Sequence, residues 1–136
     1  MAHRLLLAFA AFCLCMSVFA EPLKAHIGKN RVILTFSASS DIPDRLSLIK
    51  QIEQYQCQFS DRDLVHIDLI AGSNDYRVLS QRFSVPSGEF RLVLVGKDGE
   101  LKLSTDEPLL ESVFALIDAM PMRHREQRGG KCQFGG

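Results

Sequence analysis

The sequence predicts an α/β domain built on a four-stranded mixed sheet. Three patterns support this prediction: a strand, an amphipathic helix and a second strand follow one another; an Asp-Gly pair joins two later strands; and the last predicted element is a helix with an apolar stripe. A β-α-β unit places its two strands parallel with a right-handed crossover, whereas an Asp-Gly hairpin is antiparallel. The predicted element order is therefore βαβαββα, with both strand directions in one sheet.

The first strand is expected at residues 31–37, because RVILTFS is a β-branched, apolar run typical of a strand buried on both faces. A helix should follow from Pro43, since a polar capping residue and a proline in the first turn mark a helix start. Its apolar residues recur at helical spacing within one sector of the wheel: Leu48, Ile49, Ile52, Tyr55 and Phe59. Cys57 lies far from that sector and is expected near solvent.

The second strand is expected at residues 63–70, where Val65, Ile67 and Leu69 should share one face. The opposite face then carries Leu64, His66, Asp68 and Ile70. A short helix over residues 75–83 should follow, with Tyr76, Leu79 and Phe83 as its apolar side chains.

The third and fourth strands are expected at residues 89–95 and 100–103, joined by a tight turn at residues 97–99. The segment 105–108 should open the last helix by the same capping logic as the first. That helix has an apolar stripe made of Leu109, Leu110, Val113, Phe114, Leu116, Ile117 and Met120, and Pro121 should end it.

These elements fit a sheet with strand order 2-1-3-4, its third strand antiparallel to the others and helices on both faces, which is the thioredoxin-like fold. We assign residues 21–122 to this domain and residues 123–136 to a basic, flexible tail. The tail's charge has two interpretations: solvated chain, or docking on an anionic surface. Its basic residues are Arg123, His124, Arg125, Arg128 and Lys131.

Residues 1–20 have the layout of a signal peptide: a basic start ending at Arg4, an apolar run over residues 5–18, and small or modest residues up to Ala20. The apolar run is shorter than the roughly 20 residues that span a bilayer. A retained anchor and a lipoprotein are the alternatives, although neither Cys13 nor Cys15 follows the small residue that lipid attachment requires. The sequence therefore predicts a periplasmic or secreted protein.

Composition argues against a nucleic-acid partner, because Lys and Arg total 16 and Asp and Glu also total 16. No segment after residue 20 is long and apolar enough to span a membrane. Two cysteines, Cys57 and Cys132, remain once the signal peptide is removed. In an oxidising compartment they indicate a disulfide, within one chain or between two, or else thiols of no consequence. The predicted topology brings both to one face and favours the intramolecular bond.

Three segments resemble domain-of-unknown-function family 4174. They are residues 62–68 (RDLVHID), residues 82–108 (RFSVPSGEFRLVLVGKDGELKLSTDEP) and residues 116–123 (LIDAMPMR). The likeness extends over roughly residues 24–125. It implies a peroxiredoxin-like domain of the thioredoxin superfamily, found in exported bacterial proteins and in vertebrate extracellular proteins with sushi repeats. It implies no established activity.

The residues that follow the first strand are the first candidate site. Thioredoxin-fold redox enzymes place their reactive cysteine there, at the start of the next helix, where its thiolate is stabilised. This sequence has Ser39, Ser40 and Asp41 instead. Two interpretations are open: the three residues cap the helix, or the exposed helix N-terminus binds an anion or a partner's carboxylate.

His66 and Asp68 form an i, i+2 pair on one strand face, a spacing that occurs in metal sites but also in ordinary edge strands. Zinc needs a third and a fourth ligand. No serine–histidine–acid set, phosphate loop or paired-carboxylate motif accompanies them. We therefore expect neither a metal nor a cofactor.

Two functions are compatible with these observations. The first is a non-catalytic thioredoxin-like binding module whose partner is an envelope or extracellular protein. The second is a peroxiredoxin-like oxidoreductase that uses Cys57 or Cys132. The absence of a cysteine at the helix start favours the first.

Overall fold

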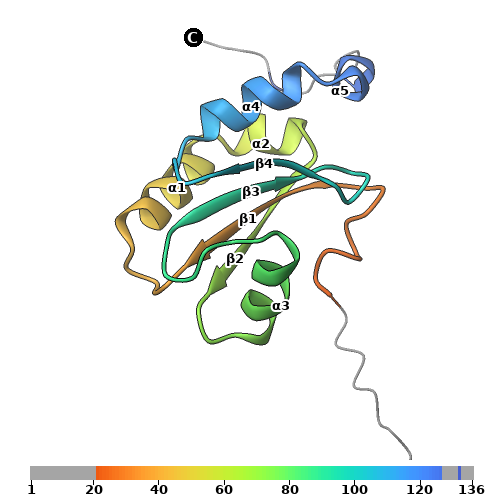
Figure 1. Ribbon diagram of the computed structural model, residues 1–136. Coiled ribbons are helices and arrows are strands. Elements are labelled where there is room, and N and C mark those ends of the chain that lie inside the picture. The colour runs from red at the N-terminus through yellow and green to blue at the C-terminus, as the bar shows by residue number, and fades with distance from the viewer. Residues whose placement is uncertain (1–20, 127–131, 133–136) are drawn as a thin grey trace, which may run out of the picture.

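The computed structural model describes residues 21–126 and residue 132. Its sheet has the strand order β2-β1-β3-β4 (Figure 1). The strands are β1 (Arg31–Ser37), β2 (Leu64–Ile70), β3 (Arg91–Val95) and β4 (Leu101–Thr105). β1 pairs parallel with β2 and antiparallel with β3, and β3 pairs antiparallel with β4. The predicted fold class, strand order and strand directions are confirmed.

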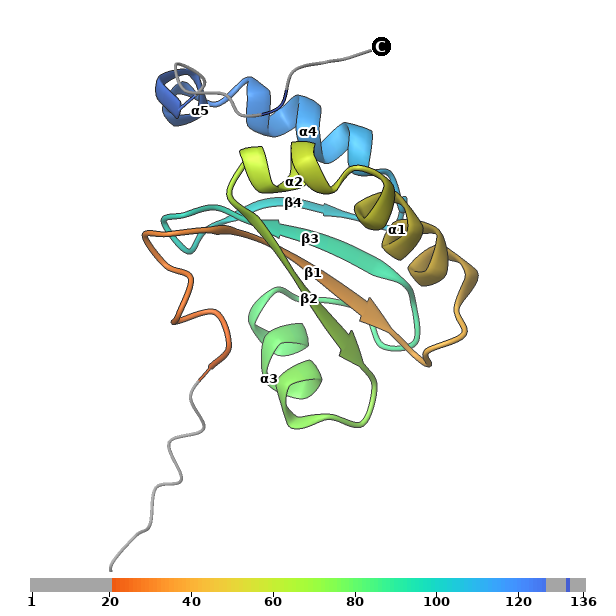
Figure 2. The same cartoon turned by 180° about the vertical axis from the view of Figure 1, so that it is seen from behind.

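Helices cover both faces of the sheet (Figures 1 and 2). One face carries α1 (Pro43–Gln54), α2 (Gln56–Asp61) and α4 (Leu110–Asp118), with α5 (Pro121–Glu126) beyond the end of α4. The opposite face carries α3 (Asn74–Arg82).

Alternation along β1 explains this layering, because every residue of the strand is buried but successive side chains enter different cores. Ile33 packs with Leu48 and Ile52 of α1 and with the apolar stripe of α4. Val32, Leu34 and Phe36 pack on the α3 side. A strand with a core on each face has no polar surface to display, which accounts for its continuous apolar run.

The first predicted helix is divided in two. The chain leaves helical geometry at Tyr55, with φ −110° and ψ 34°, and resumes as α2. Leu48, Ile52 and Phe59 are buried as predicted, but Tyr55 turns outward and is 40% exposed. The break changes the direction of the helix, so one wheel does not describe both halves.

The predicted capping of α1 by Ser39, Ser40 or Asp41 is wrong. Ile42 is the N-cap residue and no side chain bonds the first turn, although Pro43 does occupy the first helical position. The Ser39 hydroxyl instead donates to the Asp41 carboxylate.

The start of α4 also differs from the prediction. The helix begins at Leu110 rather than directly after Thr105, and its cap comes from α1. The Leu110 N–H donates to Gln51 Oε1 at 3.0 Å, and Gln51 Nε2 donates to the Pro108 carbonyl at 2.7 Å. A side chain 59 residues away supplies this cap, so no local sequence signal marks it.

The C-terminal boundary lies further along the chain than predicted. Residues 123–126, assigned above to a flexible tail, complete the helix α5, and Arg123 is only 2% exposed. Residues 1–20, 127–131 and 133–136 lie outside the described part of the chain, so the signal peptide and the rest of the basic tail stay predictions. No helix within the described ranges is long and apolar enough to cross a membrane.

Candidate functional site

The helix start predicted as a binding site lies between the end of β1 and the first turn of α1. Arg45, on that first turn, donates through Nη1 to the Ser40 carbonyl at 2.6 Å, which ties the loop to the helix. The hydrogen bond from Ser39 holds the pKa of the Asp41 carboxyl below its usual value. A negative charge at the helix start opposes the binding of an anion there. Anion binding by Ser39, Ser40 and Asp41 stays a prediction that this charge disfavours.

A polar network lies below this helix start and joins β1, β2 and α1. The Arg45 guanidinium donates to both carboxylate oxygens of Asp68, through Nε at 3.1 and 2.9 Å and also through Nη2. The fully buried Thr35 hydroxyl donates to Asp68 Oδ1 at 2.9 Å. Burial raises the pKa of the Asp68 carboxyl, but the hydrogen bonds from Arg45 and Thr35 outweigh it and hold that pKa low.

His66 joins the network through its ring nitrogen Nε2, 2.9 Å from the Thr35 hydroxyl oxygen. A hydroxyl has one proton, and Thr35 gives it to Asp68, so the Thr35 oxygen accepts the Nε2–H of His66. Burial lowers the pKa of His66, and the nearby Arg45 charge lowers it further against the opposing effect of Asp68. His66 and Asp68 therefore share a face as predicted and are bridged by the Thr35 hydroxyl. Within residues 21–126 and 132, no group of three His, Cys, Asp or Glu side chains is placed to hold a metal ion.

The lowered pKa of His66 predicts a pH-dependent stability. The unfolded chain binds this proton from about pH 6.5 downward, whereas folded His66 binds it only at lower pH. The free energy of unfolding should be unaffected by His66 above pH 6.5. It should then fall as the pH drops towards the folded-state pKa, by at most about 1.4 kcal/mol per pH unit for one proton. Urea unfolding between pH 7.5 and 5 measures this slope, which His66→Gln should reduce and the exposed-site variant His124→Gln should leave unchanged. An equal slope in both variants contradicts the assignment.

The second candidate site is the cysteine pair. Cys57 and Cys132 are joined in a disulfide with a Cα–Cα distance of 5.9 Å, which is the intramolecular pairing among the alternatives considered. Cys57 is exposed, as predicted. The two cysteines line a surface pocket of about 370 Å³ together with Gln56, Ser60 and Asp61. A carboxylate in this pocket disfavours a thiolate beside it.

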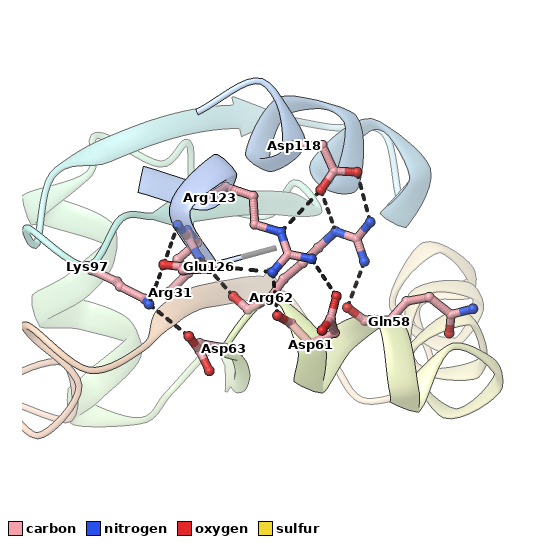
Figure 3. Close-up of polar contacts among 9 residues, drawn as sticks. All are labelled: Arg31, Gln58, Asp61, Arg62, Asp63, Lys97, Asp118, Arg123 and Glu126. Carbon is pink, nitrogen blue, oxygen red and sulfur yellow. Dashed lines mark hydrogen bonds and ion pairs between the residues drawn. The ribbon is translucent and has the colours of Figure 1, made fainter. Parts of the chain in front are cut away.

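A third cluster, which the sequence pattern did not predict, contains three buried arginines that join α4 and α5 to the rest of the domain (Figure 3). Arg31, Arg62 and Arg123 are 2%, 5% and 2% exposed. Buried cations need carboxylate or carbonyl partners to offset lost hydration. Each of the three arginines contacts a carboxylate on an element other than its own.

Arg123 of α5 reaches across to α2. Its Nη1 donates to the Asp61 carbonyl at 2.6 Å, and its Nη2 contacts the Asp61 carboxylate at 2.5 Å. Its Nε lies 3.6 Å from the carboxylate of Asp118, at the end of α4. One guanidinium thus joins three helices.

Arg62 pairs with the same α4 carboxylate, through Nε and Nη2 at 2.9 and 2.8 Å from the two oxygens of Asp118. It also donates to the Gln58 carbonyl at 2.8 Å and lies over the Phe114 ring, 4.3 Å from its centroid. This fork-to-fork geometry is the strong form of an arginine–carboxylate pair.

Arg31, the first residue of β1, binds the Glu126 carboxylate through both terminal nitrogens at 3.0 and 3.3 Å. Lys97, which follows β3, donates to the same carboxylate at 2.7 Å and to Asp63 at 2.8 Å. Burial raises the pKa of Glu126, yet the hydrogen bonds from Arg31 and Lys97 outweigh it and the pKa lies below the usual value. The sequence does contain a signal for the burial of Arg31. This residue lies on the same face as Ile33 in a strand whose apolar run predicts burial on both faces, so its side chain is expected to be buried too.

Comparisons with known proteins agree with this architecture. The family model described as Domain of unknown function (DUF4174) matches residues 22–126. No curated protein matches the chain. Among solved structures, the reduced 2-Cys peroxiredoxin of Plasmodium vivax aligns with a TM-score of 0.58 at 16% identity, covering 77% of this chain and 84% of that one. The Plasmodium yoelii thioredoxin peroxidase I aligns with a TM-score of 0.58 at 18% identity, covering 82% and 83%. At these identities the likeness establishes the fold and nothing further.

Proposed function

The chain belongs to the DUF4174 family, and from that premise we propose that it is a non-catalytic thioredoxin-like module that acts by binding a protein partner outside the cytoplasm. One observation carries the proposal: the start of α1 holds Ser39, Ser40 and Asp41 where a redox enzyme of this fold needs a cysteine.

The hydroxyl and the cation nearest that position are already bonded to other protein groups. A reactive thiolate is stabilised by free N–H donors and nearby cations. Here the Ser39 hydroxyl is bonded to Asp41, and the Arg45 guanidinium is bonded to Asp68 and to the Ser40 carbonyl. A serine hydroxyl has no redox chemistry of its own.

The oxidoreductase alternative depends on Cys57 and Cys132, and their environment opposes it. They are bonded to each other beside Asp61, with Cys57 on the short helix α2 rather than at the start of α1, and Cys132 beyond α5. Thiol–disulfide exchange is fast when the attacking sulfur is a thiolate and the leaving thiol has a low pKa. The Cys57–Cys132 bond engages both sulfurs, so neither is available as an attacking thiolate until that bond is reduced.

A binding role is supported by the surface between α1, α2 and α4. A groove of about 450 Å³ lies there, with Phe114 in its lining. Tyr55 and Leu109 also line it and remain 40% and 46% exposed. Partly exposed aromatic and apolar side chains at the edge of a groove are typical of surfaces that bind proteins.

We expect the purified domain to show no thiol–disulfide or peroxidase turnover above background. The assays are reduction of a model disulfide and consumption of hydrogen peroxide, each run on the wild type, Cys57→Ser and Cys132→Ser. All three proteins should give the same background rate. Multiple turnovers that disappear in either variant would establish the oxidoreductase and remove the binding-module proposal.

Export is proposed on the layout of residues 1–20. Protein recovered from its native host should begin at Glu21, as read by N-terminal sequencing or by the mass of the intact chain. Recovery of a chain that retains residues 5–18, or its recovery from the cytoplasm, contradicts the proposal.

A further inference from the structure

The Glu126 carboxylate occupies a site that is built like a carboxylate receptor. Two guanidinium nitrogens of Arg31 and the Lys97 ammonium surround its two oxygens at 2.7 to 3.3 Å. A planar fork with a second cation beside it is the arrangement that recognises a carboxylate most specifically.

The receptor half of this contact belongs to the sheet and not to α5. Arg31 begins β1 and is held by the Arg62 carbonyl at 3.0 Å, while Lys97 is held by Asp63 at 2.8 Å. Both cations therefore keep a partner when Glu126 is absent. They also line a pocket of about 180 Å³ that extends the site towards Met120 and Met122.

The Glu126 carboxylate belongs to α5, a short helix in which Arg123 is the one buried residue. α5 has six residues, and most of its side chains are exposed, Met122 by 50%. Isolated helices of this length are unstable in water. Among the described residues, the side-chain ion pairs of α5 are those of Arg123 and Glu126, so α5 resembles a ligand that is tethered beside its receptor.

The segment that contains α5 is attached to the rest of the domain at both of its ends. α5 is joined to α4 through Ala119 and Met120, and beyond Glu126 the chain is fixed again by the bond from Cys132 to Cys57 on α2. A segment held at both ends has a much higher effective concentration at its site than one held at a single end.

We propose that Arg31 and Lys97 form a binding site for an acidic residue of a partner peptide, that Glu126 fills this site within the chain, and that the Cys57–Cys132 disulfide keeps the partner out. The proposal rests on the proposed function and goes beyond it, because it adds a second, redox-controlled binding site to the groove between α1, α2 and α4. Opening requires a dithiol reductant. The disulfide takes two electrons and two protons to become two thiols, and the reductant becomes its own disulfide.

The site itself is tested by chemical rescue of Glu126→Ala, because acetate replaces the atoms that this substitution removes. Acetate should restore at least half of the lost Tm in a saturable manner. Neither acetamide nor sodium chloride at equal ionic strength should restore the Tm. Adding Lys97→Met should abolish the rescue, since Lys97 is one of the two receptor cations. A gain with acetate no larger than that with chloride would overturn the proposal.

The disulfide control is tested with a labelled, C-terminally amidated peptide of residues 119–126, AMPMRHRE, and a matched peptide ending in glutamine. The glutamate peptide should bind the reduced protein and the Cys57→Ser/Cys132→Ser protein at least tenfold more tightly than the oxidised wild type. The glutamine peptide should bind the reduced, variant and oxidised proteins with the same affinity. Equal binding to all three proteins, or no dependence on the glutamate, contradicts the proposal. Neither assay measures turnover, so both can fail while the non-catalytic assignment stands.

Discussion

Replacing Arg123 by methionine should lower the free energy of unfolding by about 3 kcal/mol. The substitution keeps an unbranched, apolar side chain of similar length but removes a guanidinium that is 3% exposed. It also removes the ion pair between that guanidinium and the Asp61 carboxylate, which is itself 14% exposed. Removing one partner of a buried pair costs about 3–5 kcal/mol. The lower end applies here, because Asp118 is 37% exposed and keeps Arg62 as a partner.

Arg125→Met is the matched control, since Arg125 lies on the same short helix with an exposed side chain. Urea unfolding of both variants under oxidising conditions should separate them by at least about 2 kcal/mol. Equal and small losses would mean that α5 does not depend on its buried arginine. Amide hydrogen exchange within residues 121–126 should increase in the Arg123 variant alone.

The elements that the sequence predicts correctly are those set by local periodicity. The apolar run of β1 requires two cores, and the structure provides one on each face. The Lys97-Asp98-Gly99 turn adopts its expected form, with Gly99 at φ +80° and its N–H bonded to the Gly96 carbonyl. The short helix expected over residues 75–83 forms as α3, shifted by one residue to Asn74–Arg82. Each feature depends on neighbours within a few residues, which a sequence displays directly.

The features that the sequence does not reveal depend on contacts between distant residues. Gln51 caps α4 because the fold brings α1 beside it, so the local cap predicted from Thr105 is not needed. Arg123 was assigned to a tail because its neighbours along the chain are polar. Its burial depends on Asp61, 62 residues earlier, and on Asp118. Arg31 lies within an apolar strand that indicates its burial, but no apolar run surrounds Arg123, so the partners of Arg123 must be known before its burial can be predicted.

Replacing both cysteines in Cys57→Ser/Cys132→Ser should lower the free energy of unfolding by about 4 kcal/mol in the chain-entropy model. The bond joins residues 75 positions apart, and closing a loop of that length removes much of the freedom of the unfolded chain. Urea unfolding of the variant against the oxidised wild type measures the loss. Ser60→Ala, an exposed change beside the same bond, is the control and should cost less than about 0.5 kcal/mol. A loss below about 1 kcal/mol for the cysteine variant contradicts the prediction.

The same variant combined with Arg123→Met separates two ways in which the disulfide can act. If it acts only on the unfolded chain, its effect is the same whether or not Arg123 is present, and the two losses add. If it also holds α5 in place, the oxidised Arg123 variant keeps α5 near its site and the combined variant does not. Release of α5 occurs only if it lowers the free energy of the folded double variant, so the double loss then falls short of the sum of the single losses by more than the roughly 0.5 kcal/mol scatter of independent sites. Cys132 follows Glu126 by only six positions in the sequence, so we expect the second result.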